Sequence, residues 1–303
     1  MQKEVMEKVE AFAVNREALK HETLFDYGSG EEYPGQLYDY TGIATGVDGF
    51  ESITPSHLDQ FQEQGYLVIN NAFTPTEVQD ALDGLSYLIA GQNPDYHGLM
   101  FEKKAKGINV KALPAEQRQD YIRKFMWFVD YEARLKAMAE HPKMLKLVQQ
   151  MIGDTPVLHQ DMALIKPPRI GREKPWHQDH AYFDLPINTT VVGIWIALDE
   201  ATTENGCMIV YPGSHRQGPV VHFQRRDWQI CDTHTRQQEV LAVPLKPGGA
   251  LFFHSLIHHG TPANNSTRRR RAVQFHYRPQ SAVKSNKEER LALFGEEGKD
   301  VTC

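Results

Sequence analysis

Apolar residues lie at helical spacing in the first half of the chain and in short, closely spaced runs in the second half. Residues 57–64 predict a short helix with Thr54 as its N-cap and Pro55 in its first turn, because threonine and proline favour those two positions. The helix is expected to end before Gly65, and residues 66–69 are expected to form a strand.

A second helix is predicted to start at Thr74. Thr74 and Glu77 have the spacing of a capping box, Pro75 takes the first helical position, and apolar residues follow at helical spacing. Further helices are expected over about 116–126 and from Pro142 onward.

After Gly153 the chain changes to short β-type runs separated by proline and glycine. The runs cover 156–165, 189–198, 207–211, 239–245, 249–257 and 271–277. Such runs without helices between them indicate an antiparallel sandwich or barrel. We therefore expect a mainly β protein with N-terminal helices, in which a double-stranded β-helix core, a jelly roll of the cupin kind, packs against helices.

These elements predict one large domain over residues 51–285, and 303 residues of which 41% are hydrophobic suffice for one sizeable core. Residues 1–50 are expected to form an N-terminal extension that starts with an amphipathic helix over 1–20, and residues 286–303 a C-terminal tail. Residues 216–238 interrupt the strand pattern and predict a lid or substrate loop, named the lid segment below.

Charge and cysteine content restrict the partners and the compartment. The chain has 39 acidic and 33 basic residues and a net charge of -6, so no positive field favours nucleic acid. Its three cysteines lack zinc-like spacing and cannot all pair, which favours a reducing compartment such as the cytoplasm. No apolar run is long enough to cross a bilayer, so neither nucleic acid nor membrane is expected as a partner. The sequence carries no signal for an oligomeric state.

The first candidate for chemistry is the pair His177 and Asp179. An imidazole and a carboxylate two residues apart project from the same side of an extended chain and can bind one ion. A second copy of this pattern, His159 and Asp161, shows that the spacing alone is a weak signal, and this copy stays open as an alternative ligand pair.

A third ligand is available in the segment 251–260, which holds His254, His258 and His259 at the end of an apolar strand. Two histidines and one carboxylate make up the facial triad of non-haem Fe(II) oxygenases, with positions left open for reactants. A structural zinc site would favour a closed tetrahedron with thiolates, and no cysteine is near either segment.

Four consecutive arginines, residues 268–271, begin the final apolar run. An arginine on a buried strand requires an anion, and its planar guanidinium matches a carboxylate with two hydrogen bonds, so a dicarboxylate cosubstrate would suit it. Strand alternation places Arg268 and Arg270 on one face and Arg269 and Arg271 on the other, and it leaves open which pair faces inward.

The chain resembles the phytanoyl-CoA dioxygenase family over roughly residues 50–280. The resemblance rests on six motifs in the family's order: GYLVINNAF, MALIKPP, WHQDHAYF, GIWIALDEATTENGCMIVYPGSH, KPGGALFFHSLIHHG and RRAVQFHY. It implies that Fe(II) is held by His177, Asp179 and His259, and that Arg270, eleven residues after His259, binds 2-oxoglutarate. It further implies cosubstrate contacts for Gln178, Trp195, Met162, Thr261 and Lys124.

By this resemblance the chain is expected to be an Fe(II)- and 2-oxoglutarate-dependent dioxygenase with O2 as its other cosubstrate. It would hydroxylate an unactivated C–H bond of a small organic molecule or acyl thioester and release succinate and CO2. The carboxylate of Asp179 favours hydroxylation over chlorination, while desaturation and ring formation stay open. Two other classes are alternatives: a non-catalytic metal-binding jelly roll, and a zinc hydrolase that uses the same three ligands.

Overall fold

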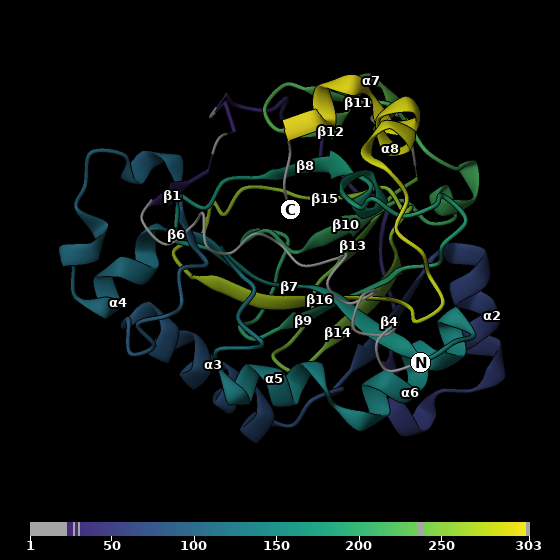
Figure 1. The fold of residues 1–303 in the computed structure, drawn as a ribbon, viewed down its shortest axis with the longest axis horizontal. Coiled ribbons are helices and arrows are strands. Elements are labelled where there is room, and N and C mark those ends of the chain that lie inside the picture. The colour runs from purple at the N-terminus through teal and green to yellow at the C-terminus, as the bar shows by residue number, and fades with distance from the viewer. Residues whose placement is uncertain (1–22, 27, 30, 236–238, 301–303) are drawn as a thin grey trace.

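The computed structural model describes residues 23–26, 28–29, 31–235 and 239–300, so the helix predicted over 1–20 lies outside the described residues. Two β-sheets face each other, with helices under the larger one (Figure 1). The strand order is β1-β5-β6-β7-β16-β9-β14-β4-β3 in the larger sheet and β2-β13-β10-β15-β8 in the smaller sheet.

The strands of the larger sheet are β1 (Leu24–Phe25), β3 (Val47–Asp48), β4 (Tyr66–Asn70), β5 (Leu99–Phe101), β6 (Ile122–Met126), β7 (Pro156–Lys166), β9 (Val192–Ala197), β14 (Ala250–His254) and β16 (Arg270–Pro279). Those of the smaller sheet are β2 (Gly42–Ile43), β8 (Lys174–His177), β10 (Met208–Val210), β13 (Leu241–Val243) and β15 (His259–Thr261). A separate hairpin consists of β11 (His222–Gln224) and β12 (Trp228–Ile230). The α-helices are α2 (Pro55–Gln64), α3 (Pro75–Ile89), α4 (Ala115–Arg118), α5 (Ala133–Ala139), α6 (Pro142–Ile152), α7 (Asp232–Thr235) and α8 (Lys287–Phe294).

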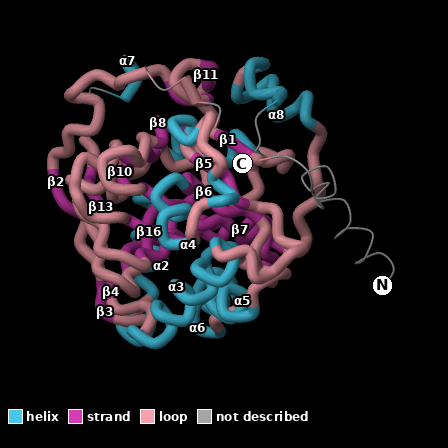
Figure 2. Tube along the Cα trace, turned by 90° about the vertical axis from the view of Figure 1, so that its left-hand side faces the viewer, coloured by secondary structure: helices cyan, strands magenta, loops and turns pink. Residues whose placement is uncertain are grey.

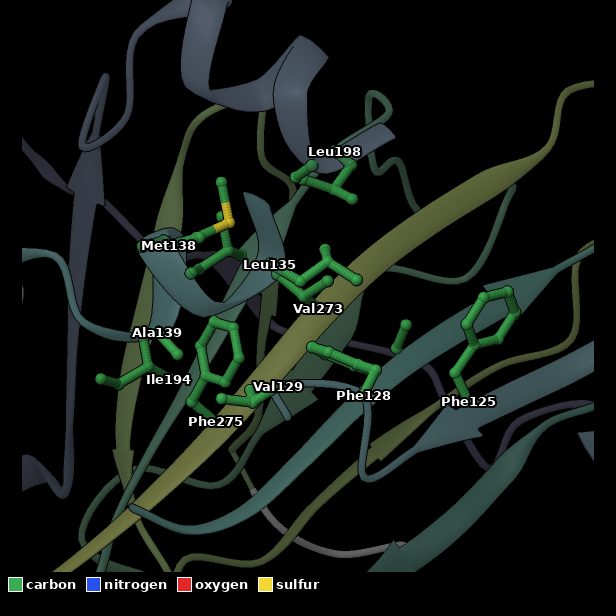
Figure 3. Packing of buried hydrophobic residues seen from close by; sticks show 14 of the residues in the cluster. Phe125, Phe128, Val129, Leu135, Met138, Ala139, Ile194, Leu198, Val273 and Phe275 are labelled. Carbon is green, nitrogen blue, oxygen red and sulfur yellow. The ribbon is translucent and has the colours of Figure 1, made fainter. Parts of the chain in front are cut away.

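Two apolar cores hold these layers together. In the first, Leu135 and Met138 of α5 pack onto Ile194 of β9 and onto Val273 and Phe275 of β16 (Figure 3). The second core fills the space between the two sheets with buried side chains that include Trp195, Phe253, Met208, Val210 and Ala242. Two facing sheets with mainly antiparallel pairing around a shared core, packed against helices, confirm the predicted double-stranded β-helix.

The helix ends follow the predicted sequence signals. The helix α2 ends at Gly65, whose φ of 77° is left-handed and therefore suits glycine. At the start of α3, the hydroxyl of Thr74 accepts a hydrogen bond from the backbone N–H of Glu77, and the Glu77 carboxylate accepts one from the backbone N–H of Thr74 at 2.8 Å. Pro142 is the first residue of α6, as predicted.

The helix predicted over 116–126 is wrong beyond its first turn. Only Ala115–Arg118 is α-helical, and Ile122–Met126 forms β6, which pairs with β5 and with β7. Hydrogen bonds along both edges of this strand outweigh the local helical pattern. The predicted strand 249–257 also ends early, at His254, and a turn separates it from β15.

The described part of the predicted N-terminal extension joins the sheets: β2 pairs with β13 and β3 with β4. At the opposite side of the molecule from α3 and α6, the lid segment forms β11, β12 and α7, and α8 lies beside it (Figure 2). Phe294 of α8 packs with Trp228 of the lid segment. No helix in the described ranges is long and apolar enough to span a membrane.

Candidate active site

Antiparallel pairing of β8 with β15 brings the two predicted histidine ligands together. His177, the last residue of β8, is the register partner of His259, the first residue of β15, and Asp179 lies two residues beyond the end of β8. The Asp179 Oδ1 atom lies 3.1 Å from His177 Nε2 and 3.6 Å from His259 Nε2. One ligand atom from each residue lies within 4.8 Å of the others, so a single metal ion fits between them.

Backbone carbonyls orient both imidazoles. The Nδ1 atom of His177 lies 2.7 Å from the carbonyl of Pro175, and that of His259 lies 3.1 Å from the carbonyl of Ile257. A carbonyl oxygen only accepts, so Nδ1 carries the hydrogen and Nε2 is left to bind a metal. Burial, with a contribution from His177, lowers the pKa of His259 to about 3, which keeps its imidazole neutral near pH 7.

Asp179 is ionised despite its burial. Burial alone would raise the pKa of this carboxyl, but the nearby imidazoles of His259 and His276, and the hydrogen bond that His276 donates, hold it well below the usual range. The site therefore presents one negative charge and two neutral nitrogens, a donor set that fits Fe(II).

The second copy of the pattern has a different role. The Oδ2 atom of Asp161 accepts hydrogen bonds from the backbone N–H groups of Phe128, at 2.5 Å, and Val129, at 3.0 Å. The ring of His159 contacts Phe183 edge-on at 4.8 Å. Neither residue belongs to the only possible metal-binding group found among the described residues.

Arg270 lies in the same pocket as the triad. Its side chain is 2% exposed, its Nη1 donates to the carbonyl of Leu164 at 3.0 Å, and its guanidinium lies 5.2 Å from the ring centre of Trp195. Burial lowers the pKa of Arg270 to about 9, and among the described residues its Nε has no hydrogen-bond partner. A buried guanidinium with an unused donor fits an incoming carboxylate.

Arg271 faces the other way and makes two hydrogen bonds of 2.8 Å with the carboxylate of Asp199. The structure thus places Arg270, and not Arg271, in the pocket. Three further residues predicted to contact the cosubstrate, Met162, Thr261 and Lys124, line the same pocket. Trp195 lies behind Arg270 and is fully buried.

Gln178, like Trp195, is a predicted cosubstrate contact that does not line the pocket. Its side-chain amide donates to the carbonyls of Gly218, at 2.9 Å, and Leu256, at 2.7 Å, and accepts from the backbone N–H of Val220 at 2.9 Å. Its own backbone N–H donates to His222 Nε2 at 3.1 Å. Gln178 therefore joins the lid segment to the chain between His177 and Asp179.

Replacing Gln178 with leucine is expected to loosen the lid segment. The Val220 amide loses its acceptor, and losing a buried hydrogen bond costs about 1 kcal/mol or more, so hydrogen exchange at Val220 should be at least about fivefold faster. Gln160→Leu is the matched control because Gln160 holds the same position in the other copy of the pattern. Equal exchange rates at Val220 in the wild type and Gln178→Leu would contradict this account.

Two residues that contact Asp179 were not predicted. His276 Nε2 lies 2.7 Å and Gln274 Nε2 3.2 Å from Asp179 Oδ2. Both lie an even number of residues from Arg270 on β16. Once Arg270 is assigned to the inward face, strand alternation therefore places their side chains on that face too. Another part of the pocket lining, formed by Lys174, Tyr182 and Asp227 and called the outer wall below, was not predicted either.

The comparisons agree with this geometry. The model of the family "Phytanoyl-CoA dioxygenase (PhyH)" matches residues 61–272. Similar proteins include the phytanoyl-CoA dioxygenase domain-containing protein 1 of Danio rerio, 27% identical over 264 residues that cover 74% of this chain and 89% of that one. Another is the phytanoyl-CoA dioxygenase of Arabidopsis thaliana, 28% identical over 260 residues, covering 76% of this chain and 90% of that one.

Solved structures with the same fold include the carbocyclase SnoK from nogalamycin biosynthesis, with a TM-score of 0.59 and 20% identity, covering 83% of this chain and 93% of that chain. EctD from S. alaskensis matches with a TM-score of 0.58 and 21% identity, covering 75% of this chain and 76% of that chain. The family match covers more than half of the chain, and the triad and the buried arginine fit iron and a carboxylate. The chain therefore belongs to the phytanoyl-CoA dioxygenase family and is an Fe(II)- and 2-oxoglutarate-dependent oxygenase.

Proposed function

We propose that the chain is a hydroxylase that inserts oxygen into an unactivated C–H bond of a small organic molecule or acyl thioester, with release of succinate and CO2. The observation that carries this proposal is one pocket lined by His177, Asp179 and His259 together with the buried Arg270. A metal site alone would not require a buried guanidinium with an unused donor.

Each group in the pocket has a defined task in this proposal. The two imidazoles and Asp179 hold Fe(II) on one side and leave its other positions open. Arg270 and Lys124 bind the distal carboxylate of 2-oxoglutarate, with Thr261 and Met162 lining its site and Trp195 supporting the guanidinium. Iron, 2-oxoglutarate and O2 together supply the oxidising chemistry.

The substrate would bind against the outer wall of the pocket, near the lid segment. The ring of Tyr182 lies edge-on to His177, with 5.9 Å between ring centres, and its hydroxyl accepts a hydrogen bond from Lys174 Nζ at 2.8 Å. Lys174 also pairs with Asp227 at 3.1 Å. Burial opposes ionisation of Asp227, but Lys174 and Arg172 hold the pKa of its carboxyl well below the usual range. These ion pairs close the outer wall, so they would help to exclude water during the reaction.

Similar proteins suggest two substrate types. Relatives named phytanoyl-CoA dioxygenase act, by that name, on an acyl thioester, and the structure of EctD contains 2-oxoglutarate and 5-hydroxyectoine. Both types fall within the proposed class. The carboxylate of Asp179 favours hydroxylation, because a chlorinating enzyme would need that position for halide.

We also propose a cytoplasmic location. Cys207 and Cys231 are free thiols, which suits a reducing compartment. Cell fractionation with antibodies to the protein tests this, and recovery with the peroxisomal fraction would contradict it.

Anaerobic titration of the Fe(II)-loaded protein with 2-oxoglutarate tests the function. A weak visible charge-transfer band should appear on binding, and on admission of air with substrate, succinate should form in equal amount to the oxidised product. The product should carry a hydroxyl group, which mass spectrometry identifies by the added oxygen. Absence of the band in iron-loaded protein would contradict the oxygenase assignment, and turnover that continues without O2 would indicate the zinc hydrolase instead.

A further inference from the structure

The Asp179 carboxylate has two different oxygen atoms. Its Oδ1 faces the two histidine ligands, whereas its Oδ2 faces away from them, toward two side chains of β16. On that side, His276 Nε2 lies at 2.7 Å and Gln274 Nε2 at 3.2 Å. His276 is fully buried and Gln274 is 3% exposed.

The hydrogen positions follow from the chemistry of the acceptor. An ionised carboxylate only accepts hydrogen bonds, so His276 must carry a hydrogen on Nε2 and Gln274 must direct its NH2 group toward Asp179. Gln274 Nε2 and His276 Nε2 are also 3.2 Å apart, but both are donors, so no hydrogen bond joins them. The other ring nitrogen of His276, Nδ1, has no partner among the described residues. Among the described residues, Asp179 is therefore the acceptor for the N–H group of this imidazole.

Two donors occupy the two lone pairs of Oδ2, and only Oδ1 is left to bind a metal. We propose that His276 and Gln274 are positioning residues that hold Asp179 as a ligand through one oxygen. A carboxylate that bound through both oxygens would take a second position on the metal. The pair thereby keeps one more position open for the reactants.

The placement of these residues on one strand makes the arrangement rigid. Even-numbered side chains of β16 lie on one face of the sheet, because side chains alternate along a strand. This inner face carries Arg270, Gln274 and His276, whereas Val273 and Phe275 lie on the other face, in the core that packs against the helices. Since β16 is hydrogen-bonded on both sides, by β7 and β9, its inner side chains have fixed positions. One strand thus orients the metal ligand at one point and the proposed cosubstrate anchor at another.

Titration of the metal-free protein with Co(II) tests the proposal without any turnover. Outer partners of metal ligands contribute about 10- to 100-fold to affinity, so His276→Leu should weaken Co(II) binding by that factor and change its visible spectrum, which responds to coordination number. His276→Gln keeps a donor on a side chain of similar reach and should restore most of the affinity.

His159→Leu is the matched control. The rings of His159 and His276 both contact Phe183 edge-on, at 4.8 Å and 5.1 Å, so both variants remove an imidazole from the same aromatic ring. Only His276 contacts Asp179. Co(II) affinity in His159→Leu should stay within about twofold of the wild type. Wild-type affinity and spectrum in His276→Leu, or an equal loss in both variants, would overturn the proposal.

Gln274→Leu gives a second measurement should His276→Leu not fold. It removes one of the two donors and should weaken Co(II) binding by about tenfold or more, the effect of one hydrogen bond to a charged group. Unchanged affinity would overturn the proposal. The inference rests on the metal site of the proposed function and on no particular reaction. Wild-type protein that binds Co(II) as expected but never turns over 2-oxoglutarate would contradict the proposed function alone.

Discussion

Asp179→Asn is expected to abolish metal binding and 2-oxoglutarate turnover, with a loss of about a thousandfold or more, equivalent to about 4 kcal/mol. The substitution removes the only charge in the triad. It also turns the wrong atom toward the metal: His276 and Gln274 both donate to the position of Oδ2, so the carbonyl oxygen of the asparagine must lie there. Its NH2 group then points between the two histidines, and an NH2 group has no lone pair for a metal.

Asp161→Asn is the control for this substitution because it makes the same chemical change in the other copy of the pattern. Asp161 accepts two backbone N–H groups, so its replacement is expected to lower the free energy of unfolding by about 1 to 3 kcal/mol. Metal affinity should not change. Calorimetry of metal binding and of thermal unfolding measures both effects, and the reverse result would identify His159 and Asp161 as the ligands.

The two copies illustrate how far sequence reasoning reaches. His159 and Asp161 have the same spacing as His177 and Asp179, so local geometry cannot separate them. Their positions in the sheets do: Asp161 lies within β7, which pairs along both edges, whereas Asp179 lies just after the end of β8. Beyond the end of a strand, the backbone and side chains are free to turn toward a bound ion. The order of the motifs in the resembled family had already favoured His177 and Asp179 over the first pair.

Other features depended on contacts between distant parts of the chain. Gln274 and His276 act on a carboxylate 95 and 97 residues earlier, and no local pattern reports such a contact. The helix predicted over 116–126 was wrong because strand pairing from both sides decides the conformation of Ile122–Met126. The direction of Gln178 depends on the lid segment, which it contacts through Gly218 and Val220. The fold class and the triad, in contrast, follow from periodicity and motif order.

Arg270→Met is expected to raise the 2-oxoglutarate concentration for half-saturation by about 30-fold or more. Removing one member of a buried, hydrogen-bonded charge pair costs about 2 to 5 kcal/mol, and the methionine fills most of the space without offering a donor. Arg271→Met is the control, because Arg271 pairs with Asp199 outside the pocket and half-saturation should stay within about twofold. Arg270→Lys should recover only part of the affinity, since an ammonium lacks the planar pair of donors. Half-saturation is measured from the charge-transfer band under anaerobic conditions.

The same substitution should have the opposite effect on the free protein. Without a cosubstrate, Arg270 is a buried cation that forms no ion pair with any described residue, and burial lowers its pKa to about 9, which reflects the cost of holding that charge inside the protein. Arg270→Met removes this cost, so the melting temperature of the metal-free protein should rise.

Adding metal and 2-oxoglutarate should then raise the melting temperature of the wild type strongly and that of the variant only by the contribution of the metal. A variant that is less stable when free, yet still stabilised by 2-oxoglutarate to the wild-type extent, would show that Arg270 serves packing and not the cosubstrate. The variant is therefore expected to have the higher melting temperature without ligands, and the wild type the higher one with metal and 2-oxoglutarate. This reversal arises because the buried charge favours binding at the expense of stability.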